Sequence, residues 1–71
     1  MTIQAVNARN QFRGRIKDIN FGEVVSEVDI ETPSGIVTAI VNTRSINELG
    51  LHVGSKALAL FKATEVALAK L

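Results

Sequence analysis

The sequence contains no cysteine, no tryptophan and no tyrosine, and it has a single proline and a single histidine, His52. Without cysteine, the chain forms no disulfide bond and no cysteine-based zinc or redox site. A lone histidine cannot hold a metal ion without carboxylate partners, so we expect no metal site. The only aromatic residues are 3 phenylalanines, so the stacking platforms typical of proteins that bind single-stranded nucleic acid are also missing.

The chain also lacks the segments that direct a protein to a membrane. It has no run of about 20 apolar residues, and residues 1–6 show neither the charged start nor the apolar core of a signal peptide. We therefore expect a cytoplasmic protein. No linker or repeat divides the sequence, so residues 1–71 are expected to form a single domain. No nucleophile–base pair or carboxylate dyad stands out, which predicts a binding protein rather than an enzyme.

Apolar residues, by contrast, are abundant for so short a chain. They make up 46% of its 71 residues, although chains of this size bury a low fraction of their surface. Residues 57–71 are apolar at both strand parities, which is typical of a strand buried on both faces. In a small barrel, the second buried face is best explained as a subunit interface. We therefore predict a homo-oligomer.

Alternating apolar residues and turn signals predict an all-β barrel or sandwich with one short helix. The expected strands are residues 11–19, 23–31, 36–42, 56–63 and 66–71. In the second of them, one face is expected to carry Val24, Ser26, Val28 and Ile30. Ser45 and Glu48 are spaced as a helix capping box, and Gly50 supplies a stop for the helix.

Half of the Lys and Arg residues lie in one early segment, residues 7–17. It holds four of the eight, and these share one strand parity: Arg9, Arg13, Arg15 and Lys17. Because side chains alternate along a strand, all four line one face. In a hairpin the acidic face of residues 23–31 would lie beside them, and each opposite-charge pair would contribute roughly 0.2–1 kcal/mol. We favour a charge-paired face for Arg13, Arg15 and Lys17; the alternative is a face that binds single-stranded nucleic acid.

Arg9 differs from the other three because it precedes the regular alternation. Hydrogen-bond donors occur elsewhere at Asn42, Ser45 and Lys62. Asn42 and Ser45 flank the start of the short helix, where free N–H groups and the helix dipole favour an anion. Lys62 lies in an otherwise apolar strand and needs a counter-charge. Glu65, exposure of the amine to solvent, or a bound anion would each meet this need.

Three motifs follow one another along the chain. They are Asn7-Ala8-Arg9-Asn10-Gln11-Phe12-Arg13-Gly14, Asn42-Thr43-Arg44-Ser45-Ile46-Asn47-Glu48-Leu49-Gly50-Leu51 and Phe61-Lys62-Ala63-Thr64-Glu65-Val66. In this order and spacing they resemble three signatures of the molbindins, the small Mop-type molybdate-binding proteins. Those signatures read Ser-Ala-Arg-Asn-Gln-x-x-Gly, then Thr-x-x-Ser followed by Glu-Leu-Gly-Leu, then Lys-Ala-Thr/Ser-x-Val. The resemblance covers nearly the whole chain.

The resemblance implies a five-stranded Greek-key barrel related to oligonucleotide-binding (OB) barrels. It also implies dimers that exchange strands, a homohexamer built as a trimer of dimers, and oxyanions bound at subunit interfaces. The implied molybdate-binding residues are Asn7, Ala8, Arg9, Asn42, Ser45 and Lys62. In that set Arg9 and Lys62 supply positive charge and Ala8 a backbone N–H group. Asn7 and Asn42 replace the family's usual Ser and Thr, and their side-chain amides still donate hydrogen bonds.

The chemistry of the ligand fits a site made of donors. Molybdate and tungstate are tetrahedral dianions near neutral pH, so donors alone can satisfy every oxygen. Hydrogen phosphate carries a proton that would face no acceptor, at a cost of about 1–3 kcal/mol. Sulfate has the same charge and shape, so its exclusion depends on cavity size. We predict a cytoplasmic protein that binds molybdate, or tungstate, for storage or homeostasis; nucleic-acid binding through Arg13, Arg15 and Lys17 is the alternative.

Overall fold

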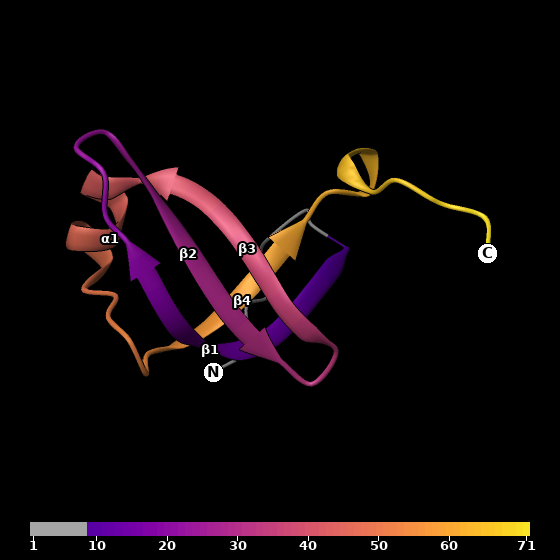
Figure 1. Cartoon of the computed structure of the whole chain (residues 1–71), viewed down its shortest axis with the longest axis horizontal. Helices are drawn as coiled ribbons and strands as arrows, with labels where there is room; N and C mark the ends of the chain where they lie inside the picture. Colours follow the sequence, from indigo (N-terminus) through magenta and orange to yellow (C-terminus); the bar gives the residue numbers. More distant parts are fainter. Residues whose placement is uncertain (1–8) are drawn as a thin grey trace.

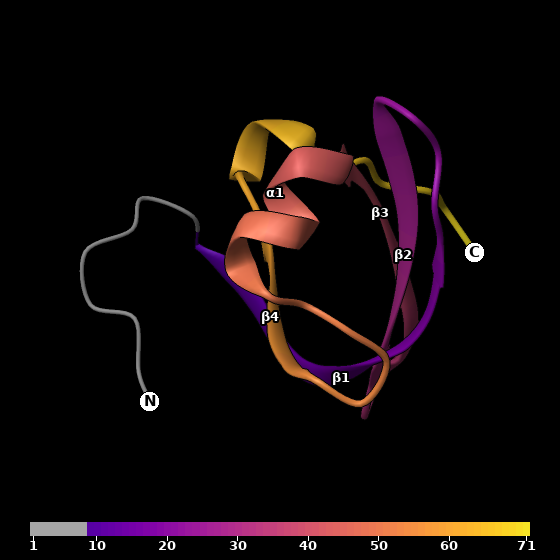
Figure 2. The same ribbon diagram turned by 90° about the vertical axis from the view of Figure 1, so that its left-hand side faces the viewer.

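The fold is a curled antiparallel sheet with one short helix. The computed structural model describes residues 9–71 (Figure 1). Its elements are β1 (Asn10–Asn20), β2 (Val25–Thr32), β3 (Gly35–Asn42), α1 (Thr43–Leu49), β4 (Lys56–Phe61) and a 3-10 turn, η1 (Ala63–Glu65). The strand order is β3-β2-β1-β4. Figure 2 shows β1 at the base of the curl, with β4 on one side and β2 and β3 on the other. The predicted class, mainly β with one short helix, is confirmed.

Alternation along β2 builds the core. Ser26, Val28, Ile30 and Thr32 are buried on one face of this strand. The neighbouring positions on the opposite face are exposed or half-buried, and apart from Val25 they carry charged side chains, which favour exposure. Ile16 from β1 and Ile46 from α1 complete the buried cluster. The prediction for β2 therefore holds from Ser26 onward. Val24 was expected on the same face, but it precedes the strand and is 73% exposed.

The curl arises because β1 pairs with two strands along different parts of its length. Its first half, from Asn10 to Arg15, pairs with β4, and its second half, from Arg15 to Asn20, pairs with β2. A register shift between Ile16 and Asp18 adds to the bend, as bulges increase local twist. At Gly14 the backbones of β1 and β2 approach so closely that a Cβ atom would collide with the carbonyl oxygen of Glu31. Glycine is therefore required where β1 turns from one partner to the other.

Helix α1 begins earlier than the capping-box spacing predicts. Asn42 is the N-cap residue and its side chain makes no capping hydrogen bond. Ser45 lies inside the helix, so its prediction as the N-cap was wrong. The start is fixed instead by tertiary contacts of Thr43, whose N–H donates to Val24 O at 2.9 Å. The predicted stop is confirmed: Gly50 has φ 65° and its N–H donates to Asn47 O, a conformation that glycine adopts readily.

The predicted fifth strand is absent from the sheet of the described residues, which has four strands rather than five. After η1, residues 66–71 run away from the sheet (Figure 1). Leu68 is 96% exposed in this segment. The physical reason is that η1 diverts the chain from the line of β4, so these residues meet no strand edge of their own chain. The sheet consequently keeps two edges, β3 and β4, and the barrel stays open.

No helix within residues 9–71 is long and apolar enough to cross a membrane.

The close approach at Gly14 predicts a large effect of a small substitution. Gly14→Ala places a methyl group against the Glu31 carbonyl and 2.9 Å from Ile30 Cγ2. Backbone atoms cannot move aside cheaply, so we expect a loss of about 1–3 kcal/mol in the free energy of unfolding. Urea denaturation at one fixed protein concentration measures it. Gly50→Asn is the control, since Gly50 has open space around it and Asn tolerates its left-handed conformation. Equal losses in the two variants would contradict the steric explanation.

Candidate anion-binding site

Two of the predicted site residues, Arg9 and Lys62, lie at one end of the β1–β4 pair. Asn10 pairs with Phe61, Arg9 directly precedes Asn10, and Lys62 directly follows Phe61. Both side chains are exposed. Within residues 9–71 neither cation forms an ion pair. Glu65, one of the alternatives considered for the counter-charge of Lys62, bonds that residue only through the backbone, its N–H donating to Lys62 O at 2.9 Å. The structure therefore brings two cations to the same strand ends, and in the described part of the chain no carboxylate forms an ion pair with either.

An aromatic contact supports this end of the sheet. The rings of Phe12 and Phe61 meet edge to face, with centroids 5.8 Å apart and an interplanar angle of 77°. Such geometry adds about 0.5–1.5 kcal/mol beyond the area buried. Phe61 immediately precedes Lys62, so the contact fixes the strand end from which Lys62 projects. Asn7 and Ala8, the other predicted residues near Arg9, lie outside the described residues.

Asn42 and Ser45 lie at the opposite end of β1. Asn42, the last residue of β3, pairs with Val25 at the start of β2. The start of β2 lies beside the end of β1, because Asn20 pairs with Glu27. Figure 1 shows α1 at one side of the molecule and the end of β4 at the other. β1 is 11 residues long, and at roughly 3.3 Å per residue the two ends are on the order of 30 Å apart along the strand. One copy of the chain therefore does not bring the two halves of the predicted site together.

A small polar network holds Asn42 and α1 in place. The Thr43 hydroxyl donates to Gly22 O at 2.7 Å and lies 2.6 Å from the hydroxyl of Ser26. Ser26 is 2% exposed and accepts a hydrogen bond from Gly22 N–H at 3.3 Å. Sequence reasoning missed this role of Thr43. The available signal was Ser26, a polar residue on the apolar face of its strand, since a buried hydroxyl needs a partner.

Next to Asn42 the surface forms a hollow of about 320 Å³ lined by Glu23, Val24, Asn42 and Arg44. Arg44 is a cation that the sequence prediction did not include. Glu23 is an acceptor, so this hollow by itself is not the purely donating environment that was expected. The side chains of Asn42 and Ser45 make no hydrogen bond within the described part of the chain. Among residues 9–71 nothing therefore occupies the donors of these two side chains, which a ligand could use.

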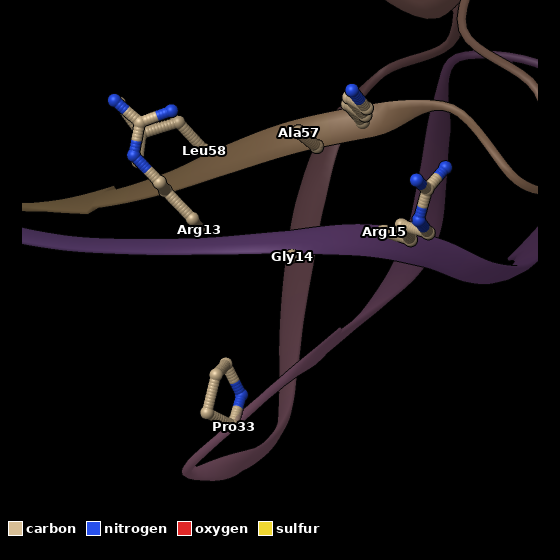
Figure 3. Close-up of a pocket in the computed structure, with 7 residues that line it drawn as sticks. Arg13, Gly14, Arg15, Pro33, Ala57 and Leu58 are labelled. Carbon is tan, nitrogen blue, oxygen red and sulfur yellow. The ribbon is translucent and has the colours of Figure 1, made fainter. Parts of the chain in front are cut away.

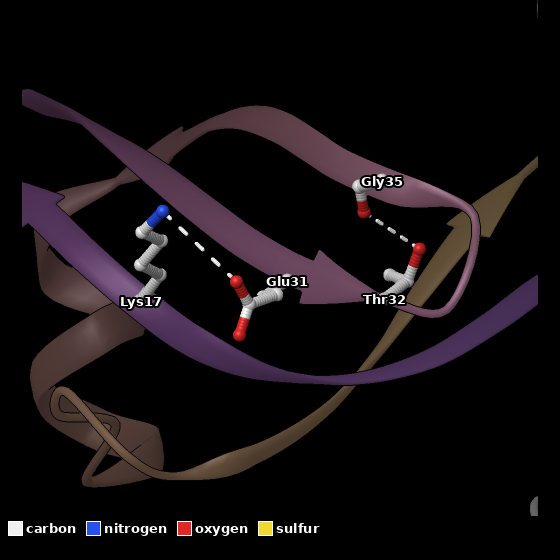
Figure 4. A network of polar contacts seen from close by, with 4 residues as sticks. All are labelled: Lys17, Glu31, Thr32 and Gly35. Atoms are coloured by element: carbon white, nitrogen blue, oxygen red, sulfur yellow. Dashed lines mark hydrogen bonds and ion pairs between the residues drawn. The ribbon is translucent and has the colours of Figure 1, made fainter.

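The expected charge-paired face is realised in part. Lys17 Nζ lies 4.0 Å from Glu31 Oε2 (Figure 4), and because both side chains are largely exposed this pair is weak. Arg15 instead donates from Nη1 to Gly54 O at 3.2 Å. Arg13 lies opposite Leu58 of β4. The register shift in β1 also places Asp18 opposite Asp29. The three cations therefore belong to two surfaces, and they form neither one paired face nor one continuous basic strip.

Comparison with known proteins identifies the family of this chain. The sequence pattern of the TOBE domain matches residues 7–68. Molybdenum-pterin-binding protein 1 of Clostridium pasteurianum is 33% identical over 63 residues, which cover 87% of this chain and 93% of that protein. The chain belongs to the TOBE-domain family, among its small Mop-type members.

Solved structures of this family share the fold. The molybdate-binding protein of Sporomusa ovata superposes with a TM-score of 0.89 at 28% identity. The superposition covers 94% of this chain and 100% of that chain. The cytoplasmic molybdate-binding protein ModG, solved with molybdate bound, gives a TM-score of 0.79 at 36% identity, covering 84% of this chain and 43% of that one. The OB-like architecture of this TOBE domain is thereby confirmed.

Some relatives are much longer. The molybdenum transport protein ModE of Azotobacter vinelandii is 45% identical over 65 residues, which cover 90% of this chain but 24% of that protein. The TOBE domain thus occurs both in small Mop-type proteins and as one part of larger proteins.

The Thr43 network predicts a specific loss of stability. Thr43→Val removes the hydrogen bond to Gly22 O and leaves the buried hydroxyl of Ser26 without this partner. We expect the free energy of unfolding to fall by about 1–3 kcal/mol, measured by urea denaturation. Thr38→Val is the matched control, since its hydroxyl bonds the Asp29 carboxylate on an exposed face. A loss at Thr38 as large as at Thr43 would show that the network does not anchor α1.

Proposed function

We propose that the chain is a cytoplasmic, non-enzymatic molybdate-binding protein that stores or buffers the anion as a homo-oligomer. The observation that carries the proposal is the placement of Arg9 and Lys62 at one end of the β1–β4 pair, two cations that form no ion pair within residues 9–71. Family membership supports it, because the small relatives and solved structures bear names of molybdenum- and molybdate-binding proteins. Tungstate has the same charge and shape and is expected to bind the same site.

The residues of this site supply charge and donors in complementary ways. Arg9 offers a planar fork of N–H groups, and Lys62 a compact ammonium with three donors. Asn42 contributes an amide NH₂ group and Ser45 a hydroxyl. These groups together suit an anion whose four oxygens all accept hydrogen bonds. Asn7 and Ala8, next to Arg9 in sequence, complete the proposed set.

The separation of the two halves supports binding between subunits. Arg9 and Lys62 lie at one end of β1, and Asn42 and Ser45 lie at the other. An anion that contacts both halves must therefore lie where one copy presents its Arg9–Lys62 end to the α1 end of another copy. Each anion then bridges two chains, and the monomer holds only half a site.

The open barrel supports the proposed oligomer. A hollow of about 720 Å³ lies inside the curl, and its mainly apolar lining includes Val37 and Val41 on β3 and Ala59 on β4. The apolar residues 66–71 have no strand partner in their own chain. Open edges expose unpaired backbone groups and invite another strand. We propose that copies exchange strands to form dimers, and that dimers assemble as a hexamer.

Two substitutions test the site directly. Arg9→Gln and Lys62→Gln remove one charge each, and each should weaken molybdate binding by about tenfold or more, because charge-assisted hydrogen bonds contribute roughly 1.5–3 kcal/mol. Isothermal titration calorimetry of the full chain measures the change. Lys17→Gln is the matched control, since it removes the same charge from the Glu31 side of β1. Binding by both site variants at the wild-type affinity would refute the assignment, and so would an equal loss in the control.

The shared site is tested by mixing two defective variants. Lys62→Gln and Ser45→Ala impair different halves, so a mixed oligomer contains some sites that draw Lys62 from one copy and Ser45 from the other. We expect co-refolded mixtures to recover high-affinity molybdate sites that neither variant shows alone. Each variant refolded by itself is the control, and light scattering verifies that both assemble. Failure of co-assembled mixtures to recover any site would place all the ligands on one chain.

A further inference from the structure

Another hollow, with basic side chains in its lining, lies along the β1–β4 pair near the turn between β2 and β3 (Figure 3). Its volume is about 590 Å³, and it is lined by Arg13, Gly14, Arg15, Pro33, Lys56, Ala57 and Leu58. Figure 3 shows the side chains of Arg13 and Arg15 extending to the same side of the two strands. None of the lining residues is acidic. The hollow shares no residue with the site proposed for molybdate.

Like charges lie close together around this hollow, and they repel one another when no anion is bound. Arg15 pairs directly with Lys56 across the two strands, and Arg13 lies two residue pairs further along, opposite Leu58. Like charges directly opposite each other destabilise an antiparallel pair. Glu31 lies opposite Arg15 on its β2 side, but within residues 9–71 its ion pair is the weak one with Lys17, 4.0 Å away, and not one with Arg15. Within residues 9–71, Arg13 and Lys56 form no ion pair.

One of the three cations is held in position. Arg15 donates from Nη1 to Gly54 O at 3.2 Å, which uses one of the five N–H groups of its guanidinium. The remaining donors stay available beside the Lys56 ammonium. This fixed guanidinium next to an ammonium is the pairing that binds a phosphate group well, since several charge-assisted hydrogen bonds converge on one anion.

The size and lining of the hollow restrict the ligand. Its volume falls within the range of about 300–1,000 Å³ typical of sites for small organic molecules, and far exceeds the needs of a lone tetrahedral anion. Leu58, Ala57 and Pro33 add an apolar surface next to the cations. The combination suits a molecule with a charged group at one end and an apolar or planar body at the other.

We infer that this hollow is a second ligand site that binds a phosphorylated organic molecule. The phosphate lies between Arg15 and Lys56 with Arg13 beside it, and the body of the ligand lies on Leu58. The bound phosphate relieves the repulsion between the opposed cations. The inference does not depend on molybdate binding, because the residues of the two sites are different.

Flavin mononucleotide is a suitable probe because it joins a phosphate to a planar ring and is fluorescent. Titrated against the full chain, it should bind saturably and more tightly than riboflavin, which lacks the phosphate, and than inorganic phosphate, which lacks the ring. Arg13→Gln and Lys56→Gln should each weaken its binding by about tenfold. Lys17→Gln, which removes the same charge outside the hollow, should leave it unchanged.

Melting temperatures measured with and without the probe distinguish a ligand-binding role of Lys56 from a merely structural one. Without ligand, Lys56→Gln should raise the melting temperature, because it removes a like-charge pair; with flavin mononucleotide, the wild type should gain more stability than the variant. The inference is overturned if flavin mononucleotide does not saturate, if riboflavin binds equally well, or if Lys17→Gln loses as much affinity as Lys56→Gln. Molybdate binding by Lys56→Gln at the wild-type affinity would confirm that the two sites are separate.

Discussion

The structure depends on the way in which β1 changes partners. Arg15 is the residue at which the change occurs, since it pairs with Lys56 of β4 on one side and with Glu31 of β2 on the other. Directly after it, Ile16 accepts from Gly54 N–H at 2.8 Å and donates to Ser55 O at 2.9 Å. The change of partner requires glycine at position 14, because any side chain there would collide with the β2 backbone. The resulting curl encloses Ile16, Val28, Ile30 and Ile46.

The change of partner along β1 also determines which charged side chains lie close to one another. A straight strand would present Arg13, Arg15 and Lys17 as one strip, but here Lys17 meets the acidic β2, Arg13 lies beside β4, and Arg15 lies between Lys56 of β4 and Glu31 of β2. Within residues 9–71 the ion pair on β1 is that of Lys17 with Glu31, in the half of the strand that pairs with β2. The other half keeps its positive charge, both in the hollow around Lys56 and at the strand ends that carry Arg9 and Lys62. A bend that closes a small core thus also separates scaffold charges from those available to anions.

Features that depend on local sequence patterns, such as strand positions and the end of the helix, could be predicted from the sequence. The first four strands were placed within two residues at most of their ends because alternation and turn residues act over short distances, and Gly50 ended the helix as expected. The helix start was misjudged because Thr43 is held by Gly22 and Ser26, which are distant in sequence. The fifth strand was misjudged because residues 66–71 have no partner edge within one chain. The separation of Asn42 and Ser45 from Lys62 was equally unpredictable, because it follows from the pairing register rather than from motif order.

Separation of the two halves has a thermodynamic consequence in the proposed assembly. A ligand that binds only the associated form stabilises that form, and association in turn raises the affinity for the ligand, since linkage is reciprocal. Without the anion, association would bring Arg9 and Lys62 of one copy near Arg44 of another, where like charges oppose contact. A dianion placed between the halves offsets this repulsion. Binding of the oxyanion and assembly of the chain are then one coupled equilibrium, and the affinity for molybdate depends on protein concentration wherever the assembled form is incompletely populated.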